Sequence, residues 1–190
     1  MADPLKIHDY LRAQTVERWT IINKTRRQSV AEHSWMVTVI AMRLYQEVSV
    51  DNRNMLPLIV AALFHDAPES RTGDIPTPGK EHIRGRSHEG IFEDIDADLM
   101  PVLPYVGGKV EPIDRMILKM ADAIEAAAWI HENGVGEHAR VVAHKMYERL
   151  TVRVEESSTE TGRNWFGAVN EVLMALGAPI IHNDSWIHKL

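Results

Sequence analysis

The chain has 190 residues, of which 45% are hydrophobic and 25% charged, and its formal net charge is −6. This length and apolar content predict one domain over residues 1–190 with a sizeable core, and the negative charge argues against nucleic acid as a partner. Cysteine is absent, which excludes disulfides, thiolate metal sites and cysteine nucleophiles. Since no segment approaches the roughly 20 apolar residues of a membrane helix, we expect a cytoplasmic protein without membrane association.

Two helices are predicted in the first third of the chain. Ser29 and Glu32 have the spacing of a capping box, and apolar residues then recur with helical periodicity over residues 30–48. Asn54 is a candidate cap for a second helix, which we expect over residues 54–66.

The middle of the chain is rich in proline and glycine. Five of these residues fall within twelve positions, so residues 67–80 are predicted to form a compact connection with at most one helical turn. Apolar residues at four-residue spacing then predict a surface helix over residues 84–100, ended by Pro101 and Pro104.

The last third of the chain is predicted to be helical. Residues 111–133 carry a long apolar stripe and end at Gly134, a candidate C-cap. Two C-terminal helices are expected within residues 137–176, separated by the polar stretch 155–161, and the tail 177–190 is unassigned. Without an alternating strand pattern or a repeat, the predicted fold class is all-α, a bundle of six or seven helices.

His65 and Asp66 are adjacent at the end of the apolar run 56–64, where an imidazole and a carboxylate would be costly to bury unpaired. His33 falls on the apolar face of the first predicted helix, and Asp122 lies within the later apolar stripe. Taken alone, a buried histidine is more often an inert core residue, and a basic neighbour could pair the aspartate.

Together, these four residues offer two imidazole nitrogens and two carboxylates from three predicted helices. This set suits one divalent cation, such as manganese, cobalt, magnesium or zinc. A site of this kind leaves coordination positions for water and for a phosphate oxygen. The pattern therefore predicts metal-dependent hydrolysis of a phosphate ester.

The same residues resemble the metal-binding signature of the HD-domain phosphohydrolases. Five motifs are similar to those of two branches, the bacterial 5′-deoxyribonucleotidases and the small viral HD-domain deoxyadenosine triphosphate triphosphohydrolases: Arg18-Trp19, Glu32-His33-Ser34, His65-Asp66-x-x-Glu69, Thr72-Gly73-Asp74-x-Pro76-Thr77-Pro78-x-Lys80 and Lys119-x-Ala121-Asp122. The resemblance runs over residues 18–122 and does not separate the two branches.

The resemblance implies an enzyme that hydrolyses a 2′-deoxynucleotide at its 5′ α-phosphate, releasing a deoxynucleoside with phosphate or triphosphate. It also implies a small-molecule substrate, for which the viral branch suggests dATP, and assembly as a homo-oligomer. Two alternatives stay open, namely a cyclic or alarmone nucleotide hydrolase and a non-catalytic nucleotide-binding or scaffold protein. The phosphate number and the base are not fixed by these motifs.

Further site residues follow from the matched motifs. Glu69 is expected to be a general acid or base, one helical turn after the metal ligands. Asp74 is expected to assist catalysis or bind the deoxyribose hydroxyl, or else to bond only to turn amides. Arg18 and Lys80 are expected to contact phosphate, the arginine in a bidentate manner.

An apolar wall for the nucleobase is expected from Trp19, with Ile21 and Pro76 beside it. Alternatively, Trp19 packs in the core. The basic cluster at residues 24–27 could extend a phosphate funnel, or it could be a solvated charge run.

Overall fold

The computed structural model describes residues 3–48, 53–87, 90–100 and 109–182. Its regular elements in these ranges are all helices: α1 Ile7–Arg12, α2 Val30–Glu47, α3 Leu56–Phe64, α4 Glu69–Thr72, α5 Thr77–Arg84, α6 Ile91–Leu99, α7 Pro112–Asn133, α8 Gly136–Thr161 and α9 Trp165–Ala175. The all-α prediction is confirmed. None of the described helices is long and apolar enough to cross a membrane.

The structure contains nine helices in the described ranges, against the six or seven expected. The additional ones are short: α1 was not expected, and the predicted connection over residues 67–80 contains α4 and the start of α5. Pro76 and Pro78 do not interrupt α5, because they occupy its N-cap and second position, where a proline ring fits the helix.

Two boundaries differ from the predictions further along the chain. The helix expected over residues 84–100 begins only at Ile91, and Pro101 and Pro104 lie outside the described residues. The polar stretch 155–161 does not separate two helices, because α8 runs through it. That helix ends at Gly162, whose φ of 64° is a left-handed conformation that glycine adopts without strain.

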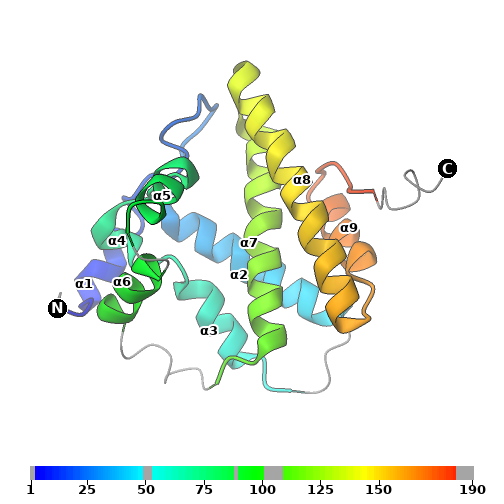
Figure 1. The fold of residues 1–190 in the computed structure, drawn as a ribbon, viewed down its shortest axis with the longest axis horizontal. Coiled ribbons are helices and arrows are strands. Elements are labelled where there is room, and N and C mark those ends of the chain that lie inside the picture. The colour runs from blue at the N-terminus through cyan, green and yellow to red at the C-terminus, as the bar shows by residue number, and fades with distance from the viewer. Residues whose placement is uncertain (1–2, 49–52, 88–89, 101–108, 183–190) are drawn as a thin grey trace.

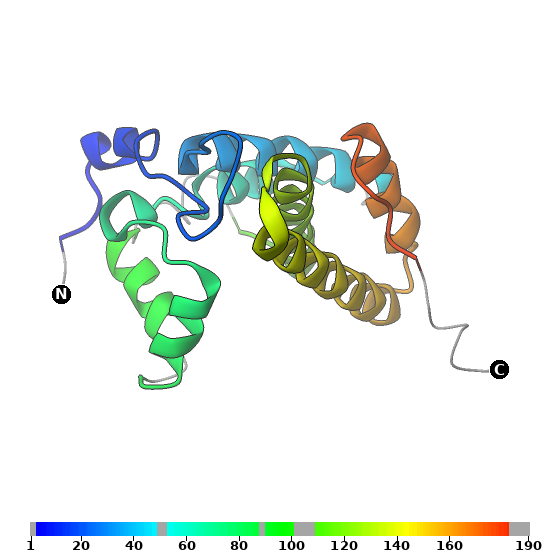
Figure 2. The ribbon, with the colours of Figure 1, turned by 90° about the horizontal axis from the view of Figure 1, so that it is seen from above.

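The centre of the molecule is a crossing of α2 and α7, which contact each other extensively (Figure 1). α3 packs on both helices, α8 lies along α7, and α9 covers the end of α2. α1, α4, α5 and α6 lie together at one side (Figures 1 and 2).

The core of this crossing is apolar. Its largest fully buried side chains include Leu44 of α2, Leu58 of α3, Ile117 and Ile124 of α7, and Trp165 of α9. Burying each such leucine or isoleucine stabilises the fold by roughly 1.5–3 kcal/mol. This apolar core therefore fixes α2 and α7 relative to each other, and with them the positions of the side chains between the two helices.

A buried ion pair ties α1 to α4. Asp9 is 4% exposed and accepts hydrogen bonds from the Lys6 backbone N–H at 2.8 Å and from Nη2 of Arg71 at 2.7 Å. The Lys6 bond is the largest influence on the pKa of Asp9, and with Arg71 it outweighs burial and lowers that pKa below 3.8.

The Asp9 contacts predict a pH-dependent contribution to stability. Because the pKa of Asp9 is lower in the folded chain, the contribution is present above the ordinary value of 3.8 and is lost as the pH falls through the folded value. Asp9→Asn should therefore lower the melting temperature at neutral pH and lose this effect in acid, at a pH below the folded pKa of Asp9. Thermal melts by circular dichroism would measure this, and an equal difference at both pH values would contradict it.

Candidate metal centre and substrate pocket

His33 lies near the start of α2, and its side chain is fully buried. Helical spacing places it on the face that also carries Val37, Ile40 and Leu44, all of which are core residues. Its Nδ1 lies 2.6 Å from Oε2 of Glu125 on α7. Since a carboxylate only accepts, Nδ1 donates, and Nε2 is left facing the other side.

His65 caps the C-terminus of α3, and Asp66 follows it. Nδ1 of His65 donates to the carbonyl of Ala62 at 2.8 Å. The other ring nitrogen, Nε2, faces His33 and lies 3.2 Å from Nε2 of that residue. Oδ2 of Asp66 lies 3.4 Å from both Nε2 atoms. Oδ1 of Asp122, on α7, lies 3.2 Å from Nε2 of His33. The structure thus brings His33, His65 and Asp66 together and places the fourth predicted ligand, Asp122, beside His33.

This cluster needs a positive charge at its centre. Burial and Arg18 lower the pKa of His33, but hydrogen bonds to the three carboxylates around it raise that pKa well above its usual value. Burial raises the pKa of Asp66, yet the two histidines and Arg18 hold it far below its usual range. The carboxylates therefore favour a positive charge among them, and Asp66 stays ionised.

The donor set fits a divalent metal ion. The ligand atoms of His33, His65 and Asp66 lie within 4.8 Å of one another, with Asp122 as the fourth donor beside His33. In each histidine, Nδ1 donates to a protein acceptor, which fixes the ring so that Nε2 faces the cluster. Metal-binding histidines in proteins are commonly oriented by such a hydrogen bond. Imidazole and carboxylate ligands accept several first-row ions.

Arg18 lies beside the cluster. Its Nη1 is 3.9 Å from Oδ2 of Asp66, and this nitrogen is buried without a hydrogen-bond partner. A buried guanidinium donor without a partner is costly. A phosphate oxygen held at the cluster would supply the missing acceptor.

Glu69, the first residue of α4, is 7% exposed. Its Oε1 accepts from Nζ of Lys80 at 3.0 Å, while Oε2 is buried without a hydrogen-bond partner. Burial, with repulsion from Asp66 and Asp74, outweighs the attraction of Lys80 and raises the pKa of Glu69 to about 7. A carboxyl group that titrates near neutral pH can both accept and donate a proton.

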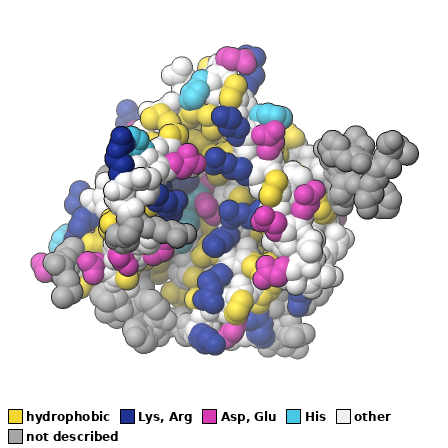
Figure 3. Space-filling view, viewed as in Figure 1, with side chains coloured by type: hydrophobic (Ala, Val, Ile, Leu, Met, Phe, Trp, Pro, Cys, Tyr) yellow, Lys and Arg dark blue, Asp and Glu magenta, His cyan; other side chains and the backbone are white. Residues whose placement is uncertain are grey.

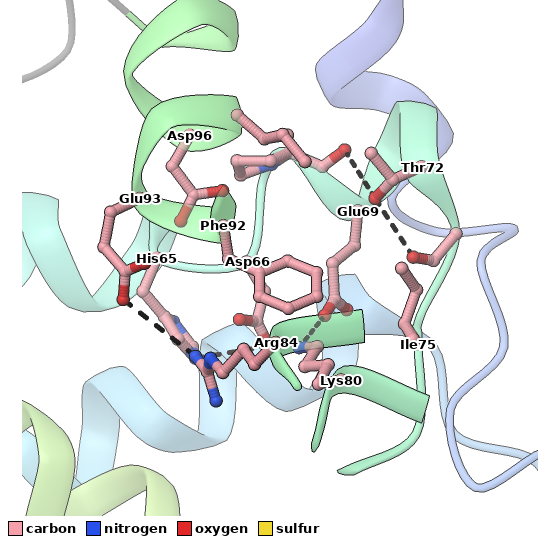
Figure 4. A pocket seen from close by; sticks show the side chains of 13 residues that line it. His65, Asp66, Glu69, Thr72, Ile75, Lys80, Arg84, Phe92, Glu93 and Asp96 are labelled. Carbon is pink, nitrogen blue, oxygen red and sulfur yellow. Dashed lines mark hydrogen bonds and ion pairs between the residues drawn. The ribbon is translucent and has the colours of Figure 1, made fainter. Parts of the chain in front are cut away.

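A pocket opens beside the cluster, and Figure 4 shows Asp66, Glu69 and Lys80 around it. Its other walls include Ile75, Arg84, Phe92, Glu93, Ile95 and Asp96. In the space-filling view the surface is hollowed between the α4 to α6 side and α7 (Figure 3). An anionic group at the metal cluster would therefore have an open path from solvent.

The residues predicted to contact the nucleoside do not gather in this pocket. Trp19 stacks on Trp129 with a centroid distance of 5.4 Å, Ile21 is 54% exposed, and Pro76 caps α5. Neither these three predicted residues nor Asp74 line the pocket beside Glu69. Their roles stay predictions.

The basic cluster at residues 24–27 has a structural explanation. Nζ of Lys24 donates to the carbonyls of Arg18 and Trp19 and pairs with Glu17 at 2.8 Å. Arg26 pairs with Glu32 at 2.6 Å, and Arg27 also pairs with Glu17. These contacts shape the loop before α2.

Sequence reasoning missed several residues at the site. Glu125 lies three residues after Asp122, so helical spacing could have revealed it. Phe92 and Asp96 of the pocket wall, and Gln28 beside Glu125, carry no local signal in the sequence. Each reaches the site only through the packing of distant segments.

Comparisons with known proteins agree with this geometry. A family model described as an HD domain matches residues 10–105. A dATP triphosphohydrolase of Salmonella phage PMBT28 is 36% identical over 159 residues, which cover 75% of this chain and 74% of the phage protein. A 5′-deoxynucleotidase of Shewanella oneidensis is 29% identical over 158 residues, covering 73% of this chain and 80% of its own.

A solved structure is also similar. It is the HD phosphohydrolase of cyanophage S-2L, bound to dA and one catalytic Zn²⁺ ion, with a TM-score of 0.74 and 27% sequence identity. The match covers 93% of this chain and 96% of the phage chain.

The metal centre predicts a metal-dependent gain in stability. Adding Zn²⁺ or Mn²⁺ to chelator-treated protein should raise the melting temperature. At a metal concentration of 100 times the dissociation constant, the free energy of unfolding should increase by about 2.7 kcal/mol. Asp66→Asn should abolish this gain, whereas His138→Ala, at an exposed histidine on α8, should leave it intact. Differential scanning fluorimetry would measure it, and an unchanged metal response in Asp66→Asn would refute the assignment.

Proposed function

We propose that this chain, which belongs to the HD-domain family of phosphohydrolases, hydrolyses 2′-deoxynucleotides at the 5′ α-phosphate with one divalent metal ion. The products would be a deoxynucleoside and phosphate or triphosphate. One observation carries the proposal: His33, His65, Asp66 and Asp122 converge beside Glu69, a carboxyl group with a pKa of about 7. This combination suits phosphate ester hydrolysis.

The chain's own groups have distinct tasks in this reaction. When bound, the metal ion polarises the phosphate and lowers the pKa of an attacking water. Nη1 of Arg18, which lacks a hydrogen-bond partner, donates to a phosphate oxygen and so holds the phosphorus in place. Glu69 takes the proton of the attacking water and returns one to the leaving 5′ oxygen, while Lys80 fixes the carboxylate through Oε1.

The charge of the surface supports a triphosphate substrate. A column of Lys and Arg side chains runs over α7 and the adjoining edge of α8, beside the hollow (Figure 3). Such a column would attract phosphates beyond the one at the metal centre. Because the phage relatives are dATP triphosphohydrolases, we place dATP first among the candidates and deoxynucleoside monophosphates second.

Assembly and location are also proposals. Trp35, Val39 and Met42 form an exposed apolar row on α2, and Trp35 is 62% exposed. This row supports a homo-oligomer, since exposed apolar patches often mark interfaces. We propose the cytoplasm as the location, because deoxynucleotides are found there.

The exposed row predicts a concentration-dependent assembly. Sedimentation velocity should detect species larger than 21.5 kDa, and Trp35→Ser should shift the protein toward the monomer. Ile180→Ser, another exposed apolar position that is not on α2, is the matched control. A monomer at all concentrations would contradict the proposal.

Product analysis tests the proposed activity. Purified protein with Mn²⁺ or Zn²⁺ is incubated with deoxy- and ribonucleotides at each phosphorylation level, and released phosphate and triphosphate are measured separately. We expect hydrolysis of deoxynucleotides, none in Asp66→Asn, and a rate about 10² to 10⁴ lower in Glu69→Gln with metal still bound. Full activity in Glu69→Gln, or turnover of ribonucleotides alone, would contradict the proposal.

A further inference from the structure

A buried chain of hydrogen bonds connects the metal ligand His33 to Trp19. Oε2 of Glu125 accepts from Nδ1 of His33, and Oε1 accepts from Nε2 of Gln28 at 2.5 Å. Oε1 of Gln28 in turn accepts from Nε1 of Trp19 at 2.9 Å. Glu125 and Gln28 are 3% and 1% exposed, so water competes little for these bonds.

The polarity of this chain is fixed by chemistry. A carboxylate only accepts hydrogen bonds and an indole N–H only donates, so the Gln28 amide can take one orientation only. In that orientation each oxygen of Glu125 accepts one hydrogen bond. Nδ1 of His33 therefore keeps the role of donor, which leaves Nε2 available to the metal centre.

Gln28 also holds the backbone beside Trp19. The backbone carbonyl of Gln28 accepts from the backbone N–H of Arg18 at 2.9 Å. Trp19 has a φ of 61°, which a residue with a Cβ rarely adopts, and Lys24 bonds to its carbonyl at 2.8 Å. A strained residue persists only where its surroundings hold it, and Gln28 supplies part of that support.

We propose that Gln28 and Glu125 are positioning residues that couple the Arg18-Trp19 segment to the metal ligand His33. Through this chain, disturbance at Gln28 weakens metal binding although Gln28 does not reach the metal cluster. It also displaces Trp19 and Arg18, which raises KM for the nucleotide. The effect on KM rests on the proposed function, whereas the effect on metal affinity rests on the hydrogen bonds alone.

Two single substitutions and their combination test the hydrogen-bond polarity. Gln28→Glu places two carboxylates face to face, and Glu125→Gln leaves two donors facing each other wherever the amides turn. The double variant exchanges the amide and the carboxylate and restores every bond, and the negative charge then lies at residue 28 instead of residue 125. Each single variant should weaken Zn²⁺ binding about 10- to 100-fold, and the double variant should recover most of that loss.

The measurements are Zn²⁺ affinity by competition with a chelating dye, and KM and kcat for the best nucleotide substrate. Thr38→Val is the control and should leave Zn²⁺ affinity unchanged, because Thr38 is a buried polar residue of α2 whose hydroxyl donates to the Ser34 carbonyl of the same helix. Unchanged affinity in both single variants, or a double variant no better than the singles, would overturn the inference. A wild-type protein without activity but with this affinity pattern would overturn only the proposed function.

The wild-type protein provides a second test if the single variants fail to fold. The ¹H–¹⁵N signal of the Trp19 indole should shift when Zn²⁺ is added without nucleotide, because its acceptor is linked to His33. The indole of Trp165, which donates to Thr161 in the core, should not shift. An unmoved Trp19 signal at saturating Zn²⁺ would also overturn the coupling.

Discussion

The buried contact between His33 and Glu125 joins α2 to α7, and the rest of the site depends on it. This 2.6 Å bond fixes the imidazole at the centre of the helix crossing, so that Nε2 meets the carboxylates of Asp66 and Asp122. The apolar core around Leu44 and Ile124 holds the two helices in place. Without that packing, four costly polar groups would not stay within a few ångströms of one another.

The environment divides the carboxylates of the site into two kinds. Asp66 and Asp122 face histidines, which keep their pKa values low and the groups ionised. Glu69 lies in the pocket wall, where burial and the charge of Asp66 raise its pKa to about 7. Such a separation supports the proposed division of tasks, with metal binding by Asp66 and Asp122 and proton transfer by Glu69.

Local signals explain what the sequence could predict. The cap at Ser29 and the periodicity behind it gave the position of α2, and with it the inward face of His33. The short helices α4 and α5 could not be predicted, because helices of four and eight residues depend on tertiary packing rather than on their own propensity. The polar end of α8 reads as a loop, yet it contains no residue that breaks a helix before Gly162.

Partners that are distant in the chain account for the rest of the site. Gln28 meets Glu125 across 97 positions, and no local pattern indicates which buried amide will do so. Trp19 was expected at the nucleobase, and the structure adds that its indole N–H belongs to the same buried chain of hydrogen bonds as His33. The four proposed ligands could be picked out from the sequence because each is a polar residue within an apolar pattern or at its end.

The central claim is that one cation is shared by His33, His65, Asp66 and Asp122. X-ray absorption spectroscopy of the Zn²⁺-loaded protein tests it most directly, because imidazole rings give a characteristic multiple-scattering pattern. The account predicts two imidazoles and oxygen ligands at about 2.0–2.2 Å from zinc, with one imidazole lost in His65→Ala. A spectrum with oxygen ligands only, or one unchanged in that variant, would contradict it.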